Sequence, residues 1–280
     1  IEHPSVTLAA QQLESQGVEL RIAQVGSNGI VSLDHLNQLV DETTLAVSVM
    51  LANNETGVIQ PVKEIAAMAH DVGALMHSDL AQSVGKLPWT VDSLAIDLGS
   101  LSAHKAHGPK GIGALYVRRG SCRVAEQQHG GHHERGMRSG TLPTHQIVGM
   151  GEAYRIAQLE SNAEIEWLSQ YRDQIEAAIE QVGGIRCNGQ RGVPHILNIT
   201  IEGVDAERLM AAMPQIAVST GSACNSATIE PSHVLQSMGL TRQQGLSSLR
   251  ISLGRMTTAD EVSILTSVLT DAVSQLRSAA

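Results

Sequence analysis

The chain has 280 residues and a mass of 29.7 kDa, which is long enough for one large domain and a smaller second one. Its formal net charge of −9 argues against nucleic acid or an anionic membrane as a partner, because both need clustered Lys and Arg. Three cysteines are too few for a disulfide framework in a chain that can build its own core, which favours a reducing, cytoplasmic setting.

Strands and helices are predicted to alternate in the first half of the chain. Residues 45–52 (LAVSVMLA) form a short apolar run typical of a strand buried on both faces. Pro61 then opens a helix that Gly73 ends, with one apolar stripe made of Ile65, Met68, Ala69 and Val72. Further strands are predicted at 74–79, 98–102 and 112–117. The alternation indicates an α/β fold with a mostly parallel sheet.

The second half begins with a long helical pattern from about residue 146, closed by Gly183 and Gly184. We place the domain boundary on this helix, with a large domain at 1–160 and a small one at 161–280. A strand at 195–201, a helix near 205–213 and a strand at 248–253 follow. Thr258 caps a last helix, because Glu261 stands three residues further on.

Polar residues follow each strand of the predicted parallel sheet. The four clusters are Asn53, Asn54 and Glu55; Asp79 with Gln82; Ser102, His104 and Lys105; and the glycine-rich loop 130–141 (GGHHERGMRSGT). Ligands of open α/β sheets bind at the carboxyl ends of the strands, so we expect these groups to converge on one rim. From the residues alone, Asp79 fits the N-cap of a helix as well as it fits a ligand-binding carboxylate.

Pyridoxal phosphate (PLP) suits this set of groups better than a nucleotide or a metal does. The stretch GPKGIG lacks the spacing and the Lys-Ser/Thr pair of a phosphate loop. The histidines around 129–133 have no accompanying metal-ligand spacing, so we expect no resident metal. PLP needs a lysine amine, a carboxylate for its pyridine nitrogen, and hydroxyl or amide donors for its phosphate.

Six stretches carry a family resemblance: NNETGVIQ, HSDLAQSVGKLP, SLSAHKAHGPKGIGALYVRR, HERGMRSGTLP, STGSACNSATIEPSHVL and SLRISLGR. In this order they resemble the class V aminotransferase superfamily, specifically cysteine desulfurases of the NifS and IscS type, over essentially the whole chain. The resemblance implies a homodimeric fold-type I PLP-dependent transferase. Its large domain has a mostly parallel seven-stranded-type sheet, incomplete here, and its smaller C-terminal domain is α+β.

The resemblance also implies roles for individual residues. Lys105 would bind PLP covalently, with Asp79 on the pyridine nitrogen and Gln82 on the phenolic oxygen. Ser102, His104 and a second subunit's Thr141 would hold the phosphate. His3 would stack on the ring and, like Lys105, could move the Cα proton. Asn54 would contact both cofactor and substrate. Arg250 would receive the substrate carboxylate, and Cys224 would take the sulfur.

Cys224 lies in STGSACNSA, a run of small residues that cannot anchor a core. Cys122 and Cys187 lack such a setting, and we interpret them as structural. The expected activity removes sulfur from L-cysteine, giving L-alanine and a persulfide on Cys224 for iron–sulfur cluster or thio-nucleoside synthesis. The partners would be a second copy and a sulfur-acceptor or scaffold protein, with Cys224 as a transient iron–sulfur ligand.

Alternative functions remain open at this point. One is a selenocysteine lyase or another class V aminotransferase, and the other is an inactive remnant that binds a sulfur acceptor. Arg250 could simply pair with a carboxylate. The chain departs from the family pattern at His132, where the family has glycine, and it lacks an upstream segment that contributes to the phosphate site. We therefore expect residues 1–280 alone to be poorly stable and to bind PLP weakly.

Overall fold

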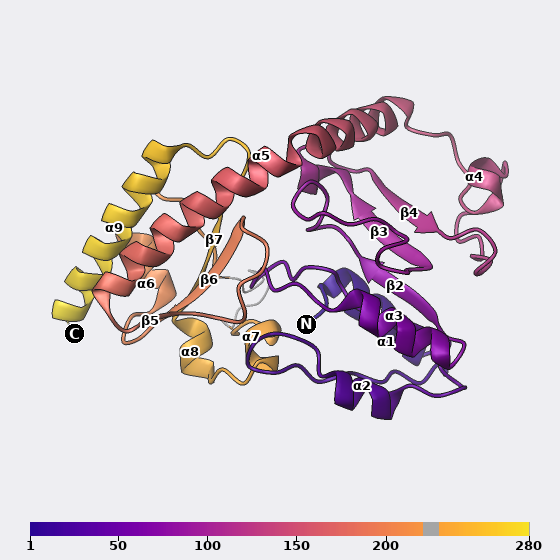
Figure 1. Ribbon diagram of the computed structural model, residues 1–280, viewed down its shortest axis with the longest axis horizontal. Helices are drawn as coiled ribbons and strands as arrows, with labels where there is room; N and C mark the ends of the chain where they lie inside the picture. The colour runs from indigo at the N-terminus through magenta and orange to yellow at the C-terminus, as the bar shows by residue number, and fades with distance from the viewer. Residues whose placement is uncertain (221–229, 280) are drawn as a thin grey trace. The chain divides into compact units, whose positions relative to one another are not determined.

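The computed structural model describes residues 1–220 and 230–279, which form parts of two compact units (Figure 1). The first unit contains Ile1–Leu39, Ala52–Pro61 and Asn162–Ala280, and the second contains Val40–Leu51 and Val62–Ser161. The division falls inside helix α5 (Thr144–Val182). Residues 1–39 and 52–61 group with the C-terminal part of the chain. The division predicted from the sequence, into domains at 1–160 and 161–280, stays a prediction.

The second unit is built on a four-stranded sheet in the order β1 (Ala46–Ser48), β2 (Leu75–Asp79), β3 (Leu98–Ser102) and β4 (Gly113–Val117). The β1–β2 and β2–β3 pairs are parallel, which confirms the predicted mostly parallel sheet. Helix α3 (Val62–Asp71) turns Ile65, Ala66 and Ala69 into the core beside β1 and β2 (Figure 1). This unit also contains two short helical turns, η1 (Ala103–Ala106) directly after β3 and α4 (His133–Gly136), and the N-terminal part of α5.

Strand β4 corrects one expectation. It pairs with β3 in the antiparallel direction, with Ser102 opposite Gly113 and Leu98 opposite Val117. Its carboxyl end therefore lies at the opposite edge of the sheet from the carboxyl ends of β2 and β3. We expected the direction of this strand to bring the loop 130–141 to the common rim, and that inference is wrong for this reason.

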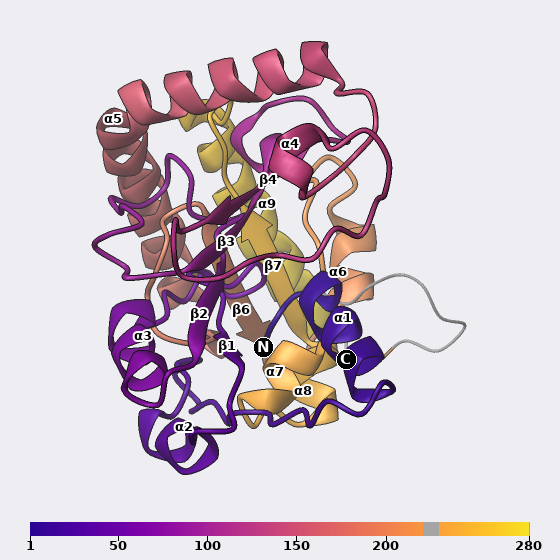
Figure 2. The ribbon, with the colours of Figure 1, turned by 90° about the vertical axis from the view of Figure 1, so that its right-hand side faces the viewer.

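The first unit contains an antiparallel sheet of β5 (Ile185–Cys187), β6 (Ile196–Ile201) and β7 (Ser248–Ser252). The C-terminal half of α5 and helix α9 (Ala259–Ser278) lie along one face of this sheet (Figures 1 and 2). Helix α6 (Ala206–Ala212) adds Leu209 to the same core. The predicted N-cap of α9 is confirmed, because Thr258 Oγ1 accepts from Glu261 N at 3.3 Å and the Glu261 carboxylate accepts from Thr258 N at 2.8 Å.

Four helices of the first unit were not predicted: α1 (Pro4–Glu14), α2 (Leu33–Leu39), α7 (His233–Ser237) and α8 (Arg242–Leu246). Helix α1 buries none of its residues, and the other three have seven residues or fewer. An apolar stripe is therefore missing or too short to detect in the sequence. Within the described residues, no helix combines the length and the apolar character needed to cross a membrane.

The second face of β6 is polar, although it is buried. Asn188 Nδ2 donates to Asn198 Oδ1 at 2.7 Å, and Thr200 Oγ1 donates to Asn188 Oδ1 at 2.9 Å. Segment 52–61 covers this face, since Asn198 Nδ2 donates to Glu55 O at 3.1 Å. Gly57 permits the close approach, because its φ is +77° and a Cβ there would stand 2.8 Å from Ile196 O. The polar ladder thus supports the turn that carries Asn54.

Arg172 on α5 is expected to be a large contributor to stability. Its side chain is 3% exposed, and its Nε donates to Glu176 Oε1 at 2.7 Å. Its Nη1 donates to the carbonyl oxygens of Val193 and Ile196 at 2.9 and 3.2 Å. Replacing Arg172 by alanine leaves these acceptors buried without their donor, so the free energy of unfolding should fall by about 3 kcal/mol in urea titrations.

Arg191 provides the control, because it pairs with the same Glu176 carboxylate at 2.9 Å from a side chain that is 50% exposed. Arg191→Ala should lower the free energy of unfolding by less than about 1 kcal/mol, as expected for a solvated ion pair. Equal losses in the two variants would contradict the role assigned to the buried guanidinium.

Candidate active site

Asp79 is the last residue of β2, and it stands beside Ser100 of β3 in the parallel register. Its side chain is 9% exposed, and one carboxylate oxygen accepts from Ala81 N at 2.8 Å. The residues that follow form turns rather than an α-helix, so the helix N-cap interpretation of Asp79 is wrong. A buried carboxylate at a strand end is instead available to a ligand at the edge of the sheet.

The neighbouring strand ends in Ser102, and η1 then places His104 and Lys105 at the same edge of the sheet. Ser102 Oγ lies 2.8 Å from His104 Nδ1. Desolvation, helped by the positive charges of Lys105 and Lys110, holds the pKa of His104 below its usual value. The edge therefore offers a hydroxyl, an imidazole and a lysine side chain, which together suit a phosphate.

His77 is a further polar group of this sheet, and it was not among the predicted site residues. Its ring bridges three strands, with Nδ1 2.8 Å from Ser48 Oγ on β1 and Nε2 2.8 Å from Ser100 Oγ on β3. Burial lowers the pKa of His77, and the nearby Asp79 carboxylate opposes that shift. The two-residue spacing of His77 and Asp79 on one strand was the available signal, because alternate residues share a face.

The first unit brings Asn54 and Arg250 together. Arg250 is on β7 opposite Asn198, and its Nη1 donates to Asn54 O at 3.1 Å. Asn54 Oδ1 and Arg250 Nε are buried and have no hydrogen-bond partner within the described part of the chain. Unsatisfied buried polar atoms are costly, so they indicate a bound water or ligand. The Arg250 Nε donor fits an acceptor such as the carboxylate of an amino acid, whereas Asn54 Oδ1 fits a hydrogen-bond donor.

Glu55 lies next to Asn54 and is 6% exposed. Burial raises the pKa of its carboxyl. A hydrogen bond from Ser232 partly offsets this shift, as do the charges of His233, Arg250 and the amino group of Ile1. Nothing in the sequence pattern marked Glu55 as different from its neighbours in NNETG, because Ser232 is distant in the chain.

The other predicted site residues are placed as follows. His3 is exposed and caps α1, with its ring nitrogen accepting from Ser5 N at 3.2 Å. Gln82 is half-buried in the turn after β2, and Thr141 is exposed. His132 has a φ of +55°, so the backbone at this position keeps a conformation that glycine adopts easily. Cys224 lies outside the described residues.

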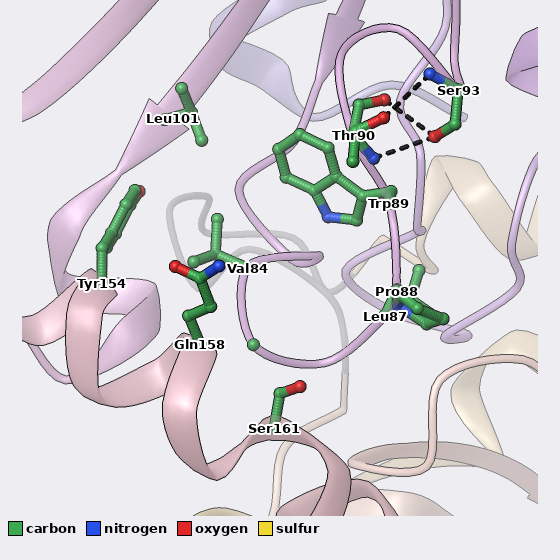
Figure 3. A pocket seen from close by; sticks show the side chains of 11 residues that line it. Val84, Leu87, Pro88, Trp89, Thr90, Ser93, Leu101, Tyr154, Gln158 and Ser161 are labelled. Atoms are coloured by element: carbon green, nitrogen blue, oxygen red, sulfur yellow. Dashed lines mark hydrogen bonds between the residues drawn. The ribbon is translucent and has the colours of Figure 1, made fainter.

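A cavity of about 550 Å³ lies elsewhere in the second unit (Figure 3). Tyr154 and Gln158 of α5 face the loop that carries Val84 and Trp89. Burial raises the pKa of the Tyr154 phenol to about 12, so it stays protonated at neutral pH. Of the predicted site residues that the structure describes, none lines this cavity. The strand-end groups carry the charges that a catalytic site needs. Within the described residues, no three His, Cys, Asp or Glu side chains are grouped as metal ligands.

Comparison with known proteins decides the family, since the Aminotransferase class-V model matches residues 1–265. The chain belongs to the class V aminotransferase family. Cysteine desulfurase IscS of Pectobacterium atrosepticum is 47% identical over 279 residues, which cover 99% of this chain and 69% of that protein. The IscS of Edwardsiella ictaluri is 46% identical over the same share of each chain.

Solved structures agree with this membership. A NifS-like protein has a TM-score of 0.90 and 32% identity, covering 98% of this chain and 73% of its own. DndA from Streptomyces lividans has a TM-score of 0.77 and 37% identity, covering 90% of this chain and 72% of its own. This member of the family is thus similar to cysteine desulfurases of the NifS and IscS type, and the resemblance found in the sequence is confirmed.

Proposed function

We propose that this family member is a PLP-dependent cysteine desulfurase that converts L-cysteine to L-alanine and leaves a persulfide on Cys224. The observation that carries the proposal is the edge formed by β2 and β3. Asp79 and the Ser102–His104–Lys105 group end two adjacent parallel strands, as the register of Asp79 with Ser100 requires. The IscS relatives, which carry the name cysteine desulfurase, support the reaction class.

The residues at this edge fit PLP by the chemistry of their donors. Lys105 supplies the amine for covalent attachment, and the buried Asp79 carboxylate suits the protonated pyridine nitrogen. The Ser102 hydroxyl and the His104 imidazole suit the phosphate, with Thr141 from a second subunit of a homodimer completing that group. Gln82, Asn54 and His3 keep the roles on the ring and the substrate that the family resemblance implies.

Bound there, PLP supplies an electron sink that stabilises negative charge on an amino acid substrate. Arg250 and Asn54 bind the substrate carboxylate, to which the unsatisfied Arg250 Nε supplies a hydrogen-bond donor. Lys105 or His3 moves the Cα proton. The Cys224 thiolate attacks the substrate sulfur, so a sulfur–sulfur bond forms while the carbon–sulfur bond breaks. The electron pair of the broken carbon–sulfur bond stays on the carbon, which then takes up a proton to give L-alanine.

The persulfide sulfur would then pass to an acceptor or scaffold protein of iron–sulfur cluster or thio-nucleoside synthesis, with Cys224 also serving as a transient iron–sulfur ligand. The acidic chain with three cysteines suits a cytoplasmic protein. These partners and this location are part of the proposal.

The test measures L-alanine and sulfide after L-cysteine is added to the purified protein with PLP. Two proteins are compared: residues 1–280, and the same residues extended before Ile1 by the corresponding upstream segment of the Pectobacterium relative. We expect the extended protein to release L-alanine and to carry a persulfide on Cys224, found by mass spectrometry after alkylation. PLP is titrated into both proteins, and the two Kd values are compared.

Other results would point to the alternatives. Turnover of selenocysteine without turnover of cysteine would favour a selenocysteine lyase. PLP binding without release of sulfur would favour another class V reaction. Failure of both proteins to bind PLP would overturn the proposed function.

A further inference from the structure

The turn Asn53–Gly57 is fixed from within. Asn53 Oδ1 accepts from Glu55 N and Thr56 N at 2.9 Å each, and from Thr56 Oγ1 at 3.1 Å. Gly57 N closes the turn by donating to Asn53 O at 3.0 Å. A side chain that accepts several turn amides holds the backbone in one conformation. The directions of the Asn54 and Glu55 side chains are therefore set together.

The same turn is bonded to the sheet of the first unit at two successive carbonyl groups. Arg250 Nη1 donates to Asn54 O, and Asn198 Nδ2 donates to Glu55 O, at 3.1 Å each. Asn198 and Arg250 are cross-strand partners on β6 and β7. The guanidinium that is proposed to bind the substrate carboxylate is thus oriented by the backbone next to Glu55.

The Glu55 side chain makes a third connection. Its Oε2 accepts a hydrogen bond from the hydroxyl of Ser232, a residue 177 positions further along the chain. Ser232 is the N-cap of α7, and its Oγ accepts from Val234 N at 3.1 Å and Leu235 N at 3.4 Å. Both groups are buried, so the hydroxyl proton has a fixed acceptor and the hydroxyl oxygen has fixed donors.

We propose that Glu55 is a positioning residue of the substrate site, joining the turn that carries Asn54 to the N-terminus of α7 and so orienting Arg250. The inference rests on the proposed function for the identity of the substrate. Glu55 acts through Asn54 and Arg250 rather than on the reacting atoms. A carboxyl accepts the Ser232 hydrogen bond, and a glutamine carbonyl of the same length can do so as well.

The experiment is a double-mutant cycle on Glu55 and Ser232 in the extended protein with PLP bound. Calorimetry gives the Kd for L-alanine, and steady-state kinetics give KM and kcat for L-cysteine. Glu55→Ala and Ser232→Ala should each weaken L-alanine binding and raise KM about five- to tenfold, the loss expected for one buried hydrogen bond, with a smaller change in kcat. The double variant should be no weaker than Glu55→Ala, and Glu55→Gln should stay within about twofold of the parent.

Thr258→Ala is the matched control, because it removes an N-cap hydroxyl from α9 of the same unit. It should lower Tm, by less than Ser232→Ala does because Thr258 is exposed, while leaving the Kd for L-alanine unchanged. Loss of Tm with an unchanged Kd in Glu55→Ala, or additive effects in the double variant, would overturn the inference.

Hydrogen exchange at the amides of Val234 and Leu235 separates this inference from the proposed function. Exchange should be faster in Glu55→Ala than in the parent, and it should return to the parental rate in Glu55→Gln. Unchanged exchange in Glu55→Ala would overturn the inference even if cysteine is turned over. Absence of cysteine turnover by the parent would overturn the proposed function alone, since the exchange measurement needs no substrate.

Discussion

Replacing Lys105 by alanine should abolish covalent PLP attachment and lower L-alanine production by about 1000-fold or more. Lys105 stands in η1 directly after β3, beside the Ser102–His104 pair and one strand from Asp79. The proposed function gives Lys105 both covalent attachment and proton transfer, and a proton-transfer role alone contributes about 100- to 10,000-fold at typical enzyme sites, or about 3–5 kcal/mol. The visible absorbance of bound PLP and the rate of L-alanine release report the two roles separately.

Borohydride trapping followed by peptide mapping identifies the attached lysine. The label should appear on the peptide that contains Lys105 and be lost in Lys105→Ala. Lys63→Ala is the control, because Lys63 is exposed on α3, and it should keep parental absorbance and turnover. A label on Lys63, Lys86 or Lys110 in the parent would show that the amine has been assigned to the wrong residue.

Replacing Cys224 by alanine should separate cofactor binding from sulfur release. In the proposed reaction the thiol acts after the substrate has bound, so PLP absorbance and L-cysteine binding should persist. L-alanine release without added thiol should fall at least about 100-fold, since the attacking nucleophile is gone. The persulfide should also disappear from alkylated protein analysed by mass spectrometry.

Cys187 and Cys122 offer matched controls for this variant. Cys187 is exposed on β5, but desolvation of its sulfur, with Glu176 adding to the effect, raises the pKa of its thiol. The thiol form is a poor nucleophile, so Cys187→Ser should keep the parental rate. The half-buried Cys122 should likewise tolerate serine without loss of turnover. Parental sulfur release by Cys224→Ala would place the nucleophile at another residue.

Local sequence patterns determined much of the fold of this family member. The apolar runs that became β2, β3, β4 and β6 were placed within one or two residues at each end. The capping signal at Thr258 and Glu261 located the start of α9, because this interaction involves residues only three positions apart. Asp79, Ser102, His104 and Lys105 could be selected as a group because parallel strands bring their carboxyl ends to one edge.

Only the tertiary structure decided the features that depend on distant partners. The direction of β4 depends on its pairing with β3, and the predicted rim failed at the loop 130–141 for that reason. Residues 52–61 group with β6 because Asn198 reaches the backbone of Glu55 across 143 positions. The roles of His77 and Glu55 depend likewise on serines far away in the chain. Propensity and periodicity describe neighbours within a few residues, whereas burial of a polar side chain against a remote partner is decided by packing.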